Sequence, residues 1–158
     1  MKEATVRDFF SGTAPPDRLA AEARDAVEPL GGTARRIHIE DLPAGEEVTV
    51  TREMLLRLCD ATLAGSISAA ALETIAFAII ASDHFRWEDD DGVAGRVLLD
   101  WASPEINWEL TPGNLRMFRE WLTGEVRPPS EPDVTADTLS GPGLPRRRSK
   151  VRVVPGAN

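Results

Sequence analysis

Apolar residues recur at helical spacing between Ser68 and Ala81, and this stretch constrains the fold more than any other. The rule of apolar side chains at i, i+3, i+4, i+7 and i+8 is met by Leu72, Ile75, Ala76, Ile79 and Ile80. A serine just before such a run is a favoured N-cap, and Ser68 stands there. The pattern predicts a central, buried helix.

Capping residues predict the neighbouring helices. Thr51 and Thr111 each stand where a helix can begin, and Gly65 and Gly124 stand where one can end. Apolar stripes predict helices over residues 51–64, 91–102 and 111–123, with a short one over 3–10 and another from 17 toward 30, where Leu19, Ala23, Ala26, Val27 and Leu30 share a stripe. We therefore expect a mainly α domain of about five helices.

A small β-hairpin is expected beside these helices. Ile37 and Ile39 alternate with polar residues, as do Val48 and Val50, and the turn residues 43–45 (Pro-Ala-Gly) lie between the two segments. Because an isolated two-stranded hairpin is marginally stable in water, we expect this one to pack against the helices.

Charge and proline content divide the chain. Residues 46–125 carry 15 acidic and 6 basic side chains, whereas residues 126–158 carry 3 acidic and 6 basic ones. We predict an acidic α-rich domain over 1–125, with an N-terminal helix and hairpin region (1–45) and a helical core (46–125), followed by a flexible Pro/Gly-rich linker and basic tail (126–158). The acidic body should repel nucleic acid and membrane phosphates and attract cationic partners.

The location of the protein is predicted from its apolar segments. The N-terminal residues 1–8 have no apolar signal region. The most apolar run, 63–81, is interrupted by glycine, serine, glutamate and threonine, and a bilayer span needs about 20 mostly apolar residues. We expect a cytoplasmic protein with no membrane contact.

Acidic and aromatic residues gather in the last third of the helical core. All four tryptophans lie between Trp87 and Trp121, in a protein without tyrosine. Large rings supply contact energy, while carboxylates select a basic partner. Trp101 and Trp121 belong to core stripes. The predicted partner-binding residues are Asp83, Trp87, Glu88, Asp89, Asp90, Asp91, Asp100, Glu105, Trp108 and Glu109.

Catalytic and metal-binding signatures are weak. Cys59 lies on an apolar helical stripe, which indicates a buried thiol and not a nucleophile. No G-x-S-x-G, P-loop or dinucleotide motif is present. His84 and Glu88 are four residues apart, as metal ligands on one helix can be, but no further ligand supports them. We predict neither a cofactor nor a metal.

The C-terminal tail carries a second candidate surface. Its basic residues are Arg146, Arg147, Arg148, Lys150 and Arg152. Such a cluster can contact nucleic acid or another anion through electrostatic, salt-sensitive interactions. The same tail can instead solubilise the chain or fold back on the acidic body.

One resemblance bears on function. The segment 63–70 (Leu-Ala-Gly-Ser-Ile-Ser-Ala-Ala), followed by a helix and the acidic residues 87–91, resembles small helical immunity proteins of bacterial bacteriocin and contact-dependent toxin systems. The resemblance implies an inhibitor that covers the basic cleft of a nuclease toxin with carboxylates that mimic phosphates. The leading hypothesis is thus a non-enzymatic, immunity- or antitoxin-like module for a basic protein. The alternatives are a nucleic-acid-associated regulator that uses the tail and a divalent-metal-dependent enzyme.

Overall fold

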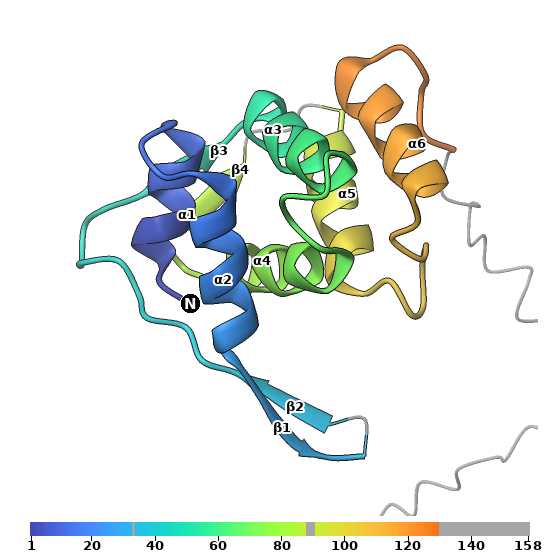
Figure 1. Ribbon diagram of the computed structural model, residues 1–158. Coiled ribbons are helices and arrows are strands. Elements are labelled where there is room, and N and C mark those ends of the chain that lie inside the picture. The colour runs from blue at the N-terminus through green and yellow to red at the C-terminus, as the bar shows by residue number, and fades with distance from the viewer. Residues whose placement is uncertain (33, 88–90, 130–158) are drawn as a thin grey trace, which may run out of the picture. The chain divides into compact units, whose positions relative to one another are not determined.

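Helices dominate the computed structural model, which describes residues 1–32, 34–87 and 91–129 (Figure 1). Within these residues lie six helices, α1 (Glu3–Phe10), α2 (Pro16–Asp25), α3 (Arg52–Leu63), α4 (Ala69–Ala81), α5 (Val93–Ala102) and α6 (Pro112–Thr123). Four short strands accompany them, β1 (Val27–Gly31), β2 (Ala34–Ile37), β3 (Val48–Val50) and β4 (Phe85–Trp87). The mainly α prediction is confirmed, with six helices where about five were expected.

Helix α4 is the centre of the packing, as its sequence predicts. It contacts α1, α2, α3 and α5. Leu72, Ile75 and Ile79 are fully buried, and each such side chain contributes roughly 1.5–3 kcal/mol of hydrophobic stabilisation. Most of the interaction that holds the first and last parts of the domain together therefore runs through this one helix.

Aromatic rings join α5 to α6. The Trp101 and Phe118 ring centroids are 6.1 Å apart with an interplanar angle of 89°, and those of Phe118 and Trp121 are 5.2 Å apart at 89°. Edge-to-face pairs of this kind place the positive ring edge against the negative ring face. All three side chains are buried, which confirms the predicted core positions of Trp101 and Trp121.

The predicted caps hold the helix ends. The side-chain oxygen of Thr51 accepts a hydrogen bond from the Met54 amide, and Ser68 does the same for the amide of Ala71. Thr111 caps α6 in the same manner. At the other end of α6, Gly124 has φ +79°, which a side chain with a Cβ rarely adopts. Local chemistry thus sets these boundaries.

The predicted extension of the second helix toward Leu30 is wrong. Helix α2 ends at Asp25, and residues 27–31 form strand β1, which pairs antiparallel with β2. Pro29 has no amide hydrogen to donate to a helix, and Gly31 and Gly32 have φ +103° and +59°, which suit a tight turn. The resulting hairpin extends away from the helices (Figure 1).

The predicted pairing of residues 36–40 with 47–51 is also wrong. Strand β3 pairs parallel with β4, so that Val48 lies opposite Phe85 and Val50 opposite Trp87. Parallel strands need a long crossover between them, and α3 with α4 forms this crossover. The pairing brings the segment that follows α4 back against the segment that precedes α3.

The predicted domain boundary and the predicted absence of a membrane helix can be compared with the described residues. Residues Met1–Pro128 form one compact unit, and the predicted boundary after Glu125 lies near its end. Among the described helices, none has the length and apolar character that crossing a membrane requires. The predicted basic tail lies outside the described residues.

Candidate functional site

The predicted acidic surface is divided between the two ends of α4 and α5. Asp83 follows the C-terminal end of α4, and Asp91 precedes α5. Glu105, Trp108 and Glu109 lie beyond the other end of α5. A ten-residue helix is about 15 Å long, so Asp91 and Glu105 are separated by the length of α5. Glu88, Asp89 and Asp90 lie outside the described residues.

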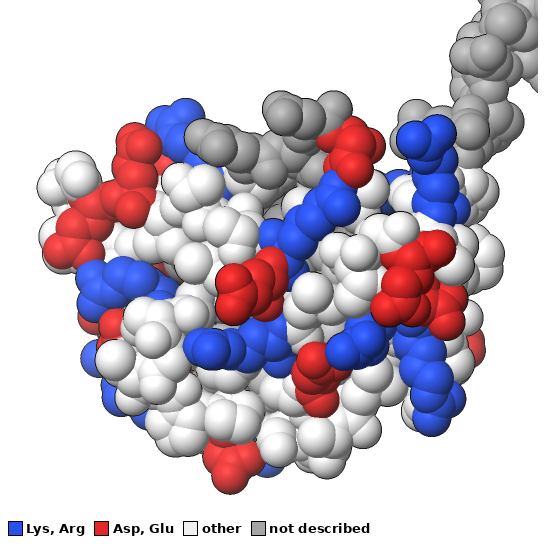
Figure 2. Space-filling view, turned by 90° about the horizontal axis from the view of Figure 1, so that it is seen from above, with Lys and Arg blue, Asp and Glu red and all other residues white. Residues whose placement is uncertain are grey.

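Ion pairs account for part of the predicted surface. Asp91 pairs with Arg52 at the beginning of α3. Seen from above the view of Figure 1, acidic and basic side chains are interspersed and do not gather by sign (Figure 2). Trp87 is half-buried and packs against the core. The described residues at this end of the domain therefore do not form a continuous acidic face with exposed rings.

Asp100 does not belong to an exposed surface, contrary to the sequence prediction. Its side chain is buried, and one carboxylate oxygen lies 3.8 Å from Nε of Arg96. Burial raises the pKa of the Asp100 carboxyl, and the positive charge of Arg96 opposes this shift. The Arg96 guanidinium in turn lies 5.4 Å from the centre of the Trp121 ring. The position at the end of an apolar stripe, beside Trp101, explains the burial.

The loop between α5 and α6 has the predicted combination of exposed carboxylates and exposed large apolar side chains. Glu105, Trp108 and Glu109 are exposed, and Ile106 between them is 78% exposed. Trp108 is 38% exposed. We call the four side chains of Glu105, Ile106, Trp108 and Glu109 the loop surface. It combines two carboxylates with two large apolar groups in five consecutive positions.

Hydrogen bonds fix the backbone of this loop. The amides of Ile106 and Asn107 donate to the Ser103 carbonyl at 3.3 and 3.2 Å. The Asn114 side-chain amide donates to the Glu109 carbonyl at 2.8 Å, and Asn114 itself lies in the capped first turn of α6. The backbone that carries the loop surface is thus ordered before any partner arrives, which lowers the entropy cost of binding.

A groove of about 640 Å³ adjoins the loop surface. It runs between the N-terminal end of α4 and the α5–α6 loop, and we call it the acidic groove. Its lining residues are Arg35, Ala69, Ala70, Glu73, Pro104, Glu105, Glu109 and Leu110. Arg35 pairs with Glu73. Glu105 and Glu109 form no ion pair within the described part of the chain, so the groove keeps an unbalanced negative charge.

The metal hypothesis finds no support in the geometry. Helix α4 ends at Ala81, so His84 does not lie on it, and Glu88 lies outside the described residues. Instead, Nδ1 of His84 lies 3.0 Å from Oε2 of the buried Glu3. Across residues 1–32, 34–87 and 91–129, no group of three or more His, Cys, Asp or Glu side chains could hold a metal ion.

The single cysteine is buried, as predicted. The Cys59 thiol donates to the Leu115 carbonyl at 3.2 Å. Burial raises the pKa of this thiol to about 12; the negative charge of Asp60 adds to this shift, and the positive charge of Arg119 opposes it. A thiol with so high a pKa has almost no thiolate near neutral pH and makes a poor nucleophile.

Known proteins add no further assignment. No family model, curated protein or solved structure matches the chain. The predicted anion contacts from Arg146 to Arg152 lie outside the described residues and stay a prediction. The sequence interpretation missed Ile106 and Glu73, although each left a signal. Ile106 is an apolar residue in a loop bounded by prolines, and Glu73 interrupts the apolar run of α4.

Proposed function

We propose that the protein is a binding module of immunity or antitoxin type that engages a basic protein through the loop surface and the acidic groove. One observation carries this proposal. Ile106 and Trp108 are exposed between Glu105 and Glu109, two carboxylates without an ion-pair partner in the described chain, on a loop whose backbone is already ordered. Carboxylates beside large apolar side chains thus remain the proposed contact for a basic partner, but on one loop and not on the whole predicted surface.

The two parts of this surface have different roles in binding. Exposed Trp side chains at protein interfaces are frequent hot spots, and removing one typically costs about 2 kcal/mol or more. Trp108 and Ile106 supply this apolar contact. Glu105 and Glu109 speed encounter with a basic partner and select against acidic ones. The acidic groove has room for a lysine or arginine side chain of the partner beside Glu109.

The immunity-type resemblance defines the kind of partner. A nuclease toxin has a basic cleft that binds phosphates, and a carboxylate pair can occupy such a cleft. This part of the proposal rests on the resemblance of the segment 63–70 and the residues 87–91. The loop surface supports the broader statement that the partner is basic and has an apolar contact site.

Site-specific crosslinking tests the proposal. The photo-reactive residue p-benzoylphenylalanine replaces Asn107 in one variant and Asp25 in a control, and each protein is irradiated in a lysate of the cells that encode it. We expect position 107 to yield one partner with an isoelectric point above about 9, the range of strongly basic domains. Trp108→Ala should remove this product, and Asp25→Asn should not.

Other crosslinking results would contradict the proposal. Equal products from positions 107 and 25 would show that the loop surface is not selective. A neutral or acidic partner at position 107 would contradict the proposed role of Glu105 and Glu109. A basic partner that is itself a nuclease would support the toxin assignment, which assays of its activity with and without this protein can then measure.

A further inference from the structure

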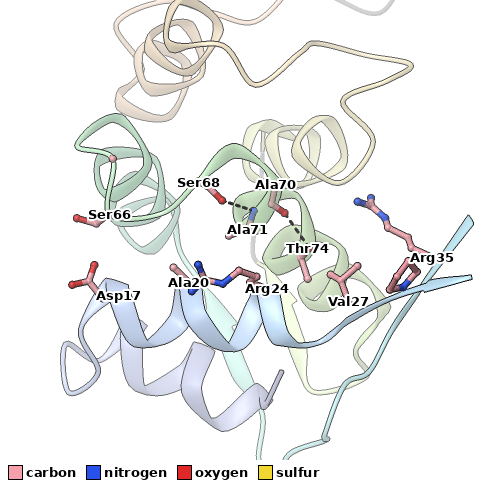
Figure 3. A pocket seen from close by; sticks show the side chains of 12 residues that line it. Asp17, Ala20, Arg24, Val27, Arg35, Ser66, Ser68, Ala70, Ala71 and Thr74 are labelled. Atoms are coloured by element: carbon pink, nitrogen blue, oxygen red, sulfur yellow. Dashed lines mark hydrogen bonds between the residues drawn. The ribbon is translucent and has the colours of Figure 1, made fainter. Parts of the chain in front are cut away.

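A second cavity lies on the other side of the α4 N-terminus. It has a volume of about 660 Å³, within the range of small-molecule sites. Helix α2, the β1–β2 hairpin, the segment before α4 and the start of α4 border it (Figure 3). We call it the arginine pocket, and its lining includes Asp17, Arg24, Arg35, Ser66, Ala71 and Thr74. None of these residues belongs to the loop surface.

The charges in this pocket differ from those of the rest of the protein. Two guanidinium groups and one carboxylate line it, in a chain of net charge −8. Arg24 is exposed and has no ion pair within the described part of the chain. Figure 3 shows Asp17 and Ser66 at one end of the pocket and Arg35 at the other, with Arg24 along α2 between them. Because Arg35 is already paired with Glu73, Arg24 is the guanidinium of the lining that has no ion pair within the described residues.

Polar groups of α4 add to this positive character. Ser68 and the first residues of α4 line the pocket, and the first turn of α4 has no acidic residue to offset its macrodipole. The Ser68 hydroxyl already accepts from the Ala71 amide at 3.2 Å, and the Thr74 hydroxyl donates to the Ala70 carbonyl at 3.0 Å. The Ser66 hydroxyl forms no hydrogen bond within the described residues and remains available.

Apolar groups complete the lining. Ala20, Val27 and Ala71 contribute methyl groups from α2, β1 and α4. A ligand that fills the pocket must therefore bury an apolar body as well as place a charge. The Arg24 fork can hold a carboxylate, phosphate or sulfonate through two parallel hydrogen bonds. Asp17 opposes a second negative charge in the same space.

We infer that the arginine pocket binds a small organic monoanion, whose charged group lies against Arg24 and whose apolar body lies against Ala20, Val27 and Ala71. The pocket and the proposed docking surface rest on different residues, apart from Arg35 and Ala70, which line both cavities. A failure of one does not decide the other.

The probe is 8-anilinonaphthalene-1-sulfonate, an apolar monoanion whose fluorescence rises in a dry site. N-phenyl-1-naphthylamine has the same ring system without the sulfonate and is the control ligand. Each is titrated into the full chain and into Arg24→Gln and Arg18→Gln. Arg18 is the matched control, because it lies on α2, outside the pocket, and pairs with Glu22 at 3.5 Å. Amide shifts in nuclear magnetic resonance spectra locate the bound probe.

We expect saturable binding of the sulfonate at one site, with amide shifts at Ser66, Ala70 and Ala71. Arg24→Gln should weaken it roughly tenfold, the loss typical of one charge-assisted contact, and Arg18→Gln should leave it unchanged. The uncharged amine should bind wild type roughly tenfold more weakly for the same reason.

Any of four results would overturn the inference. The first is no saturation below about 1 mM, a concentration that corresponds to only about 4 kcal/mol of binding free energy. The second and third are equal binding of the sulfonate by the two arginine variants and equal binding of the two probes by wild type. The fourth is amide shifts confined to residues outside the pocket.

Discussion

Arg35 on β2 forms an ion pair with Glu73 on α4, and Arg35 lies between the arginine pocket and the acidic groove. Arg35 lines both the arginine pocket and the acidic groove, whereas Glu73 lines only the groove. One guanidinium therefore adds positive charge to the pocket and cancels negative charge in the groove. The two sites share this residue, and an anion in the pocket and a cation in the groove respond to its charge in opposite ways.

Replacing Arg35 should change the two sites in opposite directions. Arg35→Gln removes a positive charge from the pocket, and we expect the naphthalene sulfonate to bind several-fold more weakly, roughly the effect of one long-range charge contact. The same change leaves Glu73 without its partner in the groove, so a basic partner should bind several-fold more tightly, about 1 kcal/mol. Fluorescence and calorimetric titrations measure the two effects.

Arg36→Gln is the control for this pair of effects. Arg36 is the next residue on β2 and pairs with Glu28 of the same hairpin at 3.2 Å. Both variants lose one positive charge, so net charge alone would move the two proteins equally. If Arg35→Gln weakened the binding of both ligands or strengthened the binding of both, the charge of Arg35 would not act on the two sites as proposed.

The aromatic contact between α5 and α6 should dominate the stability of the C-terminal half. Phe118 is fully buried between Trp101 and Trp121, and we expect Phe118→Ala to lower the free energy of unfolding by about 3–5 kcal/mol. Phe77 is 42% exposed, and Phe77→Ala should cost less than about 1 kcal/mol. Urea unfolding followed by tryptophan fluorescence measures both, and similar losses would contradict this packing.

Cys59 should react with thiol reagents only when the domain opens. Its pKa of about 12 and its burial keep the thiol protonated and shielded at pH 8. We expect the native protein to react with a disulfide reagent at least roughly a hundredfold more slowly than the urea-unfolded chain, because reaction then depends on rare opening. Fast reaction of the native protein would place the sulfur at the surface.

The stability of the protein should fall as the Asp100 carboxyl ionises. Burial raises the pKa of this group in the folded state, so the folded protein holds the proton more tightly than the unfolded chain does. The folding free energy is therefore more favourable below the unfolded pKa, near 3.9, and this contribution is lost as the pH rises through the folded pKa.

Asp100→Asn isolates this effect. The amide resembles the protonated acid, so the variant should melt at a higher temperature than wild type at pH 7, and the difference should shrink as the pH is lowered toward 4. Melting followed by circular dichroism at several pH values measures it. A variant that is less stable than wild type at pH 7 would show that the attraction to Arg96 outweighs the cost of burial.

Elements set by neighbouring residues were predictable from the sequence. The caps at Thr51, Ser68 and Thr111 act over three residues, and the end of α6 at Gly124 needs only a backbone that tolerates positive φ. The stripe of α4 is long enough for its helical period to be unambiguous. The helical core and its principal buried residues follow from such local signals.

Elements that depend on residues far apart in the sequence could not be predicted in this way. Strand β4 is three residues long, too short for an alternation to be recognised, and its partner β3 lies before two intervening helices. The acidic groove joins Glu73 to Glu109, which no periodicity connects. Of the predicted docking residues, Glu105, Trp108 and Glu109 lie together on one exposed loop of the described structure, because they are close neighbours in the sequence.

The most direct test compares two variants of this protein that have the same net charge. Their affinities for the basic partner that crosslinking identifies are measured. One carries Glu105→Gln with Glu109→Gln, and the other carries Asp25→Asn with Glu53→Gln, two exposed acids far from the loop in sequence. We predict that the first binds at least roughly tenfold more weakly in low salt, with a smaller difference in high salt, whereas the second binds like wild type. Equal affinities of the two variants would contradict a specific role for the loop surface.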